Sequence, residues 1–261
     1  MELTNITIGS DPELFLINKK TKKVVSAIGI IPGEKGNPYR SDDMPEGFGL
    51  EIDNILAEFN IPPVKSKEDF IHAINYMKNY IKEFVQDKNL DILCTASMIV
   101  NKNQLNSPEA KLFGCSVDYN AYTESPNPKP KGENTNLRSA GFHIHIGYDN
   151  NNIDTSLKIV KYLDAYLGLP SVIKDTDTRR RSLYGKAGCF RLTNYGVEYR
   201  VLSAYFLQDD NTLAWVWDRV AKALCAVNKN EILPPSDAVQ EAINTSNTKL
   251  ALNIINTYNL K

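Results

Sequence analysis

The chain has three histidines, and two of them, His143 and His145, lie two positions apart. They alternate with Phe142, Ile144 and Ile146, which predicts a β-strand with both imidazoles on one face and the apolar side chains on the other. Two imidazoles that point into one polar space suit metal ligation, phosphate contact or proton transfer. Taken alone, the segment is equally typical of a strand that exposes two histidines to solvent.

Carboxylates recur at strand spacing in two other segments. Asp11 and Glu13 alternate on a predicted strand, which places both on one face. Glu51, Asp53 and Glu58 lie in an otherwise apolar stretch, and strict alternation cannot put Asp53 and Glu58 on one face without a bulge or bend between them. Glu58 has apolar neighbours, and an isolated carboxylate in a core costs several kcal/mol. We therefore expect Glu58 to have a cationic partner.

Positive charge gathers in a third region. Glu198 and Arg200 flank Tyr199 on a predicted strand, so both charges share a face, an arrangement that a simple internal salt bridge also explains. The run 179–181 is three consecutive arginines, and Arg191 follows. In a chain with a net charge of only −1, this concentration predicts local anion binding, with a solvated basic loop as the alternative.

Together these segments predict a metal site. Glu13, Glu58 and Glu198 are expected on one sheet face with His145, where two carboxylates ~5 Å apart repel by roughly 3 kcal/mol at an effective dielectric constant of about 20. Oxygen-rich ligation with one or two imidazoles favours Mg²⁺ or Mn²⁺ over zinc. The guanidinium groups of arginines bind phosphate oxygens through paired hydrogen bonds. Since the sequence has neither a P-loop nor a G-x-G-x-x-G turn, an ATP molecule would be held by metals and arginines.

Composition limits the class of protein. The 261 residues include 30 Lys and Arg against 31 Asp and Glu, which argues against general binding to nucleic acid or membranes. Cys94, Cys115, Cys189 and Cys225 form no C-x-x-C pair and are expected as free thiols in a reducing cytosol. Residues 1–9 lack the features of a signal peptide, and no run approaches the roughly 20 apolar residues of a membrane span. A cytoplasmic location is expected.

Hydrophobic periodicity predicts an α+β domain with a mostly antiparallel sheet. A long loop over residues 31–49 is rich in Pro and Gly, and its length suggests a functional role. The predicted strands are 6–17, 24–28 in a hairpin with the first, 50–54, 56–61, 92–100, 140–148, a segment near Phe190, and 197–204.

Three longer helices are predicted to pack on the sheet. The first begins at Ser66 and carries an apolar stripe to Val85, the second is capped by Asp154 and ended by Gly168 and Pro170, and the third covers about 210–227. Two short helices follow. We expect a single domain over 1–261, with the motifs in a core of 6–205 and the C-terminal helices in 209–261.

In order along the chain, the segments D-P-E, E-x-D with A-E-F-N-I-P-P, R-S-A-G-F-H-I-H-I-G, R-x-L-Y-G-K-A-G and Y-G-V-E-Y-R resemble the phage-type carboxylate-amine ligases. These belong to the glutamine synthetase and glutamate-cysteine ligase superfamily. The resemblance runs from about Ile8 to about Ser203, and H-I-H with G-V-E-Y-R is a specific combination. It implies a glutamine synthetase-like funnel of antiparallel strands with helices on its outer face, and metals and ATP at its centre. For a phage-encoded chain it implies the host cytoplasm.

The resemblance also implies roles for individual residues. The positions that match metal ligands are Glu13, Glu58, His145 and Glu198. Arg200 matches the residue that holds the transferred phosphate.

Other positions have less defined roles in this resemblance. Arg181 and Arg191 are similar to arginines near the phosphates or the acyl substrate, and His143 is a further candidate for cofactor contact. Glu51 or Asp53 is expected to accept a proton from the amine, and the sequence does not choose between them.

The reaction implied is ATP-dependent amide formation through an acyl phosphate, with release of ADP. Asp11 is a departure, because glutamine synthetase has a glutamate there, so that enzyme's specificity is not carried over. The substrates are expected to be a small-molecule or peptide carboxylate and an amine, and the oligomeric state is open. The alternatives are a metal-dependent hydrolase, since H-x-H with acids also builds water-activating sites, and a non-catalytic nucleotide-binding protein.

Overall fold

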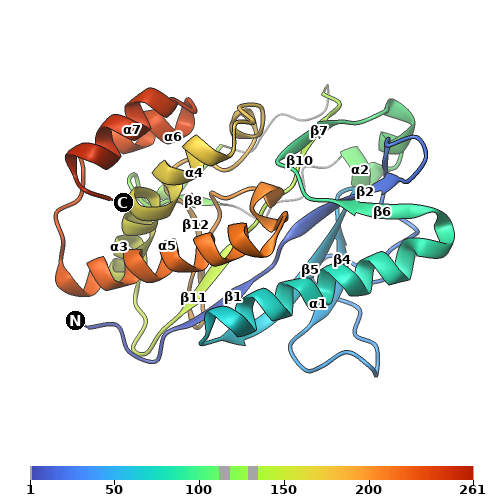
Figure 1. The fold of residues 1–261 in the computed structure, drawn as a ribbon, viewed down its shortest axis with the longest axis horizontal. Helices are drawn as coiled ribbons and strands as arrows, with labels where there is room; N and C mark the ends of the chain where they lie inside the picture. The colour runs from blue at the N-terminus through green and yellow to red at the C-terminus, as the bar shows by residue number, and fades with distance from the viewer. Residues whose placement is uncertain (1, 112–117, 129–134, 261) are drawn as a thin grey trace.

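The computed structural model describes residues 2–111, 118–128 and 135–260. Their main feature is an 11-stranded sheet in the order β3-β2-β5-β1-β11-β13-β12-β8-β9, with β4 on β5 and β6 on β2, and every pairing is antiparallel (Figure 1). The strands are β1 (Thr7–Ser10), β2 (Glu13–Asn18), β3 (Val24–Val25), β4 (Gly49–Asp53), β5 (Leu56–Val64), β6 (Leu90–Leu93), β8 (Tyr119–Asn120), β9 (Ser125–Pro126), β11 (Ile144–Gly147), β12 (Cys189–Thr193) and β13 (Gly196–Tyr199). A separate pair consists of β7 (Ser97–Ile99) and β10 (Leu137–Ser139). The predicted antiparallel α+β architecture is confirmed.

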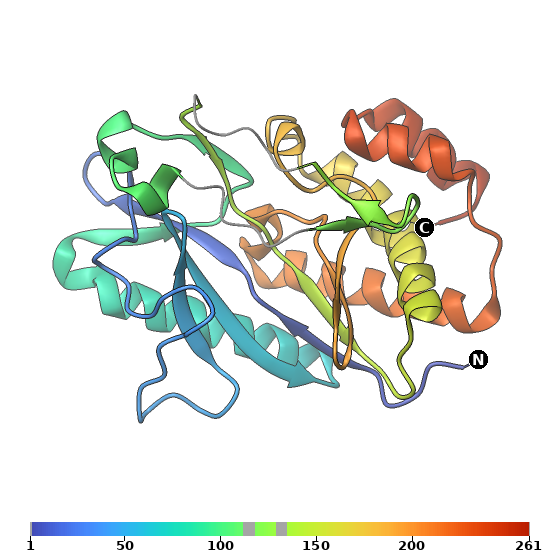
Figure 2. The ribbon, with the colours of Figure 1, turned by 180° about the vertical axis from the view of Figure 1, so that it is seen from behind.

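Helices cover one face of this sheet, and Figure 1 shows α1 and α5 lying side by side across it. Phe70 of α1 stacks on Phe142 before β11 with ring centroids 6.3 Å apart, and lies 5.5 Å from the ring of Trp217 on α5. Figure 2 shows the opposite face, which is crossed by loops. The helices are α1 (Lys67–Val85), α2 (Pro108–Lys111), α3 (Ile153–Leu163), α4 (Leu169–Lys174), α5 (Asp210–Lys229), α6 (Ser236–Asn244) and α7 (Thr248–Thr257).

A tight hairpin between β4 and β5 replaces the bend that the spacing of the acids required. Asn54 adopts a left-handed conformation with φ 57°, which asparagine tolerates well. In the resulting register Asp53 faces Leu56 and Glu51 faces Glu58. The chain reversal therefore brings all three acids of this segment together.

Three predicted boundaries were wrong. The strand expected over 6–17 is interrupted between β1 and β2 at Asp11 and Pro12, where the chain changes pairing partners. The strand expected over 92–100 is divided between β6 and β7, which belong to different sheets. Asn152, rather than Asp154, caps α3, and its side chain accepts a hydrogen bond from the backbone of Thr155.

Helix α3 also does not end at Gly168. It continues through a π-helical turn, Asp164–Gly168, into α4, and Pro170 takes its place in the first turn of α4, where no backbone donor is needed. A Cβ at Gly168 would lie 2.7 Å from the hydroxyl of Tyr199. The glycine thus serves close packing under the sheet rather than helix termination.

Two further predictions concern the whole chain. Cys94, Cys189 and Cys225 are free, whereas Cys115 lies outside the described residues. None of the helices in the described part of the chain is both long and apolar enough to span a membrane.

Candidate active site

Polar side chains from the centre of the sheet meet on the face that is turned away from α1 and α5. Two groups of them bring ligand atoms within 4.8 Å of one another and could each hold a metal ion. The groups are Asp11, His145 and Glu198, here called the first cluster, and Glu13, Asp53 and Glu58, here called the second cluster.

Strand register creates the first cluster. His145 lies opposite Gly9 on one side and Glu198 on the other, so that three adjacent strands converge on one point. Nε2 of His145 lies 3.1 Å from Oδ1 of Asp11, and Nδ1 of His145 lies 2.8 Å from the hydroxyl of Tyr195. Burial alone would raise the pKa of Asp11, but His145 and His143 hold it well below its usual range. The two imidazoles therefore favour the ionised form of Asp11.

His143 lies between the clusters, and Gly141 makes room for it. A Cβ at Gly141 would come within 2.5 Å of Nε2 of His143. The same glycine fixes Glu13, since its N–H donates to Oε2 of Glu13 (2.5 Å) and its carbonyl accepts from the N–H of Glu13 (3.0 Å). Nδ1 of His143 lies 3.1 Å from Oδ1 of Asp11 and 3.5 Å from Oε1 of Glu198. The G-F-H-I-H segment thus organises both clusters.

The second cluster is strongly acidic. Glu13 and Glu58 are direct cross-strand neighbours, and burial raises the pKa of both. For Glu58 the shift is large, because the surrounding acids Asp11, Glu13, Asp53 and Glu51 add to the effect of burial. Carboxylates held this close without a cation repel each other, and an oxygen-only donor set fits Mg²⁺ or Mn²⁺.

Two arginines contact the first cluster. Nη1 of Arg200 donates to Oε1 of Glu198, and its Nε lies 2.6 Å from Oδ1 of Asp118. Arg191 is the cross-strand neighbour of Glu198, and its Nε donates to Oε2 of that residue at 2.5 Å. Nη2 of Arg191 is 3.9 Å from Oδ2 of Asp11. The structure therefore brings two of the three arginines predicted near the phosphates to the first cluster.

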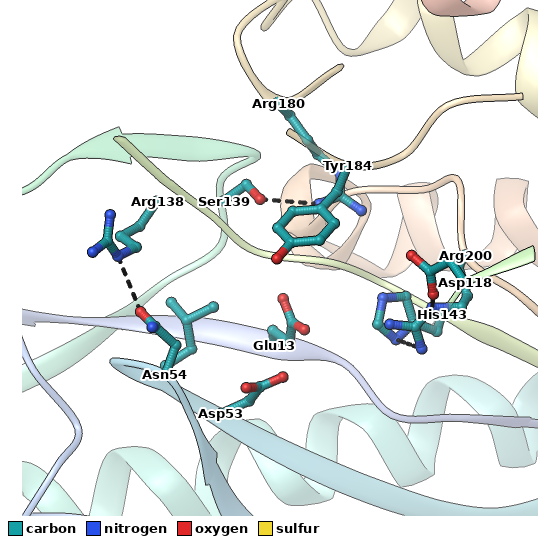
Figure 3. Close-up of a pocket in the computed structure, with 11 residues that line it drawn as sticks. Glu13, Asp53, Asn54, Asp118, Arg138, Ser139, His143, Arg180, Tyr184 and Arg200 are labelled. Atoms are coloured by element: carbon teal, nitrogen blue, oxygen red, sulfur yellow. Dashed lines mark hydrogen bonds and ion pairs between the residues drawn. The ribbon is translucent and has the colours of Figure 1, made fainter. Parts of the chain in front are cut away.

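Arg181 lies elsewhere. Its buried guanidinium places Nη1 3.4 Å from Oγ of Ser246, and the cavity beside the second cluster is lined by Arg180 instead (Figure 3). Arg180 donates to Oγ of Ser139 and to the carbonyl of Leu202, at 3.3 and 2.9 Å. Both arginines lie in a short 3₁₀ turn, Arg180–Ser182, in which side-chain directions cannot be inferred from strand alternation.

Two hollows border the clusters. The cavity beside the second cluster is lined by Glu13, Asp53, Asn54, Leu56, Asp118, Arg138, Ser139, His143, Arg180, Tyr184 and Arg200. Figure 3 shows the hydroxyl of Tyr184 pointing toward Glu13. A groove beside the first cluster is lined by residues that include Gly36, Pro38, Arg40, Glu51, His145 and Tyr195. Sequence reasoning did not single out Arg180 within the run 179–181 and missed Tyr184 and Asp118 as site residues, because none of the three belongs to an alternating strand pattern.

A buried hydrogen-bond network supports the site from beneath. Asp164 accepts hydrogen bonds from the hydroxyl of Tyr199 (2.8 Å) and the N–H of Gly188 (2.6 Å). Burial raises the pKa of Asp164 to about 7. Tyr199 lies between Glu198 and Arg200 in β13 and points to the other face of the sheet. The network therefore anchors the strand that carries both of these site residues.

Residues 133–256 match the sequence model of a family described as phage phiEco32-like COOH.NH2 ligase-type 2. Comparison with curated proteins found no match. Among solved structures, the chain is similar to a Plasmodium falciparum glutamine synthetase determined by cryo-electron microscopy, with a TM-score of 0.44 and 11% sequence identity over 88% of this chain. The match covers 52% of that synthetase chain, so this protein spans about half of its length. Over residues 133–256, which include the H-I-H and G-V-E-Y-R segments, the predicted resemblance to the phage-type carboxylate-amine ligases is confirmed.

Proposed function

We propose that the protein is an ATP- and magnesium-dependent ligase that joins a carboxylate to an amine and releases ADP. The observation that carries the proposal is the meeting of two acidic clusters with Arg200, which contacts Glu198 and lies 3.4 Å from His143. Phosphoryl transfer depends on positioned cations and arginines of this kind. The description of the matched family supports the union of a carboxylate with an amine.

Mg²⁺, or Mn²⁺, is proposed at both clusters. Asp11, His145 and Glu198 would hold one ion, while Glu13, Asp53 and Glu58 would hold the other. Bound ions supply positive charge that neutralises phosphate oxygens as charge develops on them. Neither cluster includes a thiolate, which agrees with a hard, oxygen-preferring cation.

We assign one hollow to the nucleotide and the other to the carboxylate substrate. The groove beside His145, with Tyr195 and Arg40 on its walls, would take the nucleotide, and Arg191 lies close enough to the first cluster to contact its phosphates. The cavity with Arg180 and Tyr184 would take the carboxylate substrate. In this proposal Arg180, and not Arg181, is the arginine of this turn that contacts the acyl substrate; the resemblance had placed Arg181 near the phosphates or the acyl substrate.

The chemistry proceeds in two steps. An oxygen of the substrate carboxylate attacks the γ phosphorus while the bond from phosphorus to ADP breaks, and Arg200 holds the group in transit. The amine nitrogen then attacks the carbonyl carbon of the acyl phosphate, the bond from carbon to the phosphate oxygen breaks, and the nitrogen loses a proton. Asp53 lines the cavity, whereas Glu51 lines the groove. Of these two acids, Asp53 is therefore the one within reach of an amine in the cavity.

The test is ADP release from Mg·ATP by the purified protein, with pooled small-molecule and peptide carboxylates and pooled amines. We expect release to require one pool of each kind and to be lost in Glu198→Gln, while Lys20→Met, an exposed lysine outside both hollows, behaves as the parent protein. Phosphate release that needs no amine would favour a hydrolase. A protein that does not bind Mg·ATP would refute the proposal.

A further inference from the structure

The loop between β3 and β4 is fastened to the acids of β4 at two adjacent residues. Nζ of Lys35 lies 2.7 Å from Oδ2 of Asp53, and the N–H of Gly36 donates to Oε2 of Glu51 at 2.6 Å. Asp53 belongs to the second cluster. This loop is thus tied directly to a candidate metal ligand.

The two side chains of this ion pair differ in solvent exposure. The side chain of Asp53 is 11% exposed, whereas that of Lys35 is 44% exposed. A half-exposed lysine moves into water at little cost, because ion pairs near the surface contribute little to stability. A divalent cation beside Asp53 repels the ammonium group. The lysine is therefore the partner that leaves.

The first cluster has a comparable arrangement. Glu198 there is contacted by the guanidinium groups of Arg191 and Arg200. Each cluster thus has at least one carboxylate paired with a cationic side chain of the protein. Lys35 differs from these arginines because it lies on a loop and not on a strand of the sheet.

The loop is built so that a short segment can move alone. Gly33 and Gly36 have φ of 85° and 80°, a region that favours glycine, and Glu34 pairs with Asn37 across a small turn that contains Gly36. Beyond this turn, Tyr39 remains paired with the backbone of Leu50. Residues 33–37 therefore form a flap between a glycine and a fixed bridge, and Gly36 lines the groove beside the first cluster.

We propose that Lys35 is a built-in competitor for the metal of the second cluster. It occupies Asp53 in the metal-free protein, and a divalent cation bound to Glu13, Asp53 and Glu58 displaces it, so that residues 33–37 keep only the hydrogen bond from Gly36 to Glu51 as a side-chain tie to the acids of β4. Cation binding at one cluster thereby changes the wall of the groove beside the other. The inference rests on the proposed function, because it takes the second cluster to be a metal site.

Calorimetric titration with Mn²⁺ in the absence of nucleotide tests the competition. We expect Lys35→Met to bind Mn²⁺ about threefold to fivefold more tightly than the parent protein, the effect of removing one partly exposed ion pair. Lys35→Arg, which keeps the charge, and Lys20→Met, an exposed lysine in the turn after β2, are expected to bind as the parent does. Heat that disappears in Glu58→Gln is assigned to the second cluster.

Hydrogen exchange of the peptide over residues 30–40 provides the second readout. In the parent protein, deuterium uptake is expected to rise when Mn²⁺ is added, and in Lys35→Met it is expected to be high from the start. Unchanged or weaker Mn²⁺ binding by Lys35→Met, or uptake in the parent that falls with Mn²⁺, would overturn the role of Lys35 alone. Absence of any Mn²⁺ binding by the parent would overturn the proposed function as well.

Discussion

Replacement of Glu58 by glutamine isolates the electrostatic cost of the second cluster. Glu58 is buried among Asp11, Glu13, Asp53 and Glu51, and burial together with these charges raises its pKa well above 4.5. Glutamine keeps nearly the same shape and removes the charge. In metal-free protein, we therefore expect Glu58→Gln to increase the free energy of unfolding, although it removes a proposed ligand.

The magnitude follows from the geometry. Ligand atoms of the cluster lie within 4.8 Å of one another, and two full charges at that distance repel by roughly 3 kcal/mol at an effective dielectric constant of about 20. Proton uptake by Glu58 relieves part of this repulsion, which leaves a stabilisation of about 1–3 kcal/mol. For a protein of this length, that corresponds to a rise of about 2–6 °C in Tm.

The pH dependence has a defined sign. The pKa of Glu58 in the folded protein is raised above its ordinary value of 4.5, so above pH 4.5 the folded state binds more protons than the unfolded state. Stability of the metal-free parent is therefore lost as pH rises from there toward the folded pKa. The advantage of Glu58→Gln is expected to grow as the pH rises above 4.5 and to shrink toward pH 4.5.

Thermal unfolding followed by circular dichroism, first in EDTA and then in excess Mg²⁺, measures these effects. Mg²⁺ is expected to stabilise the parent protein, because a ligand that binds only the folded state raises its stability. The stabilisation by Mg²⁺ is expected to be smaller for Glu58→Gln, which lacks one of the proposed ligands. Glu83→Gln, an exposed position on α1, serves as the matched control. A Glu58→Gln protein that is less stable than the parent in EDTA at about pH 8 would refute the electrostatic reasoning.

Three further substitutions test other parts of the site. Glu198→Gln is expected to abolish Mg²⁺-dependent nucleotide binding in equilibrium dialysis, because it removes a charged carboxylate ligand beside His145. Unchanged binding would contradict the role of Glu198 as a metal ligand. Arg200→Ala is expected to lower kcat about 100-fold or more while ADP affinity changes little, and equal losses in both would exclude a contact specific to the transferred phosphate. Tyr199→Phe removes a donor from buried Asp164 and is expected to cost about 1–2 kcal/mol in chemical denaturation, with an unchanged midpoint as the contrary result.

Alternation along strands accounts for what could be predicted of the site. His143 and His145 were predicted to share a polar face, and cross-strand pairing brings His145 beside Glu198 as that face requires. A bulge or bend between Asp53 and Glu58 was also predicted, since an odd spacing cannot keep two side chains on one face, and the structure has a chain reversal there. Local periodicity is sufficient where the strand itself determines the direction of a side chain.

The remaining features depend on contacts that periodicity does not encode. Arg180 and Arg181 are neighbours in sequence, and only the packing of their 3₁₀ turn decides which one lines the cavity. Lys35 lies in a loop without any pattern, and its pairing with Asp53 depends on the path of that loop. Gly168 was predicted to end a helix, but tertiary packing against the sheet outweighs its low helix propensity.

Asp11 and Glu13 serve different clusters although only Pro12 separates them. Two residues of extended chain span roughly 7 Å, so this tripeptide acts as a spacer that limits how far apart two bound cations can be. Proline restricts the backbone of the spacer, and its carbonyl is held by the N–H of Phe59 at 3.0 Å. The distance between the two cation sites is consequently a property of one short, stiff stretch of backbone, insensitive to which substrates the surrounding loops admit.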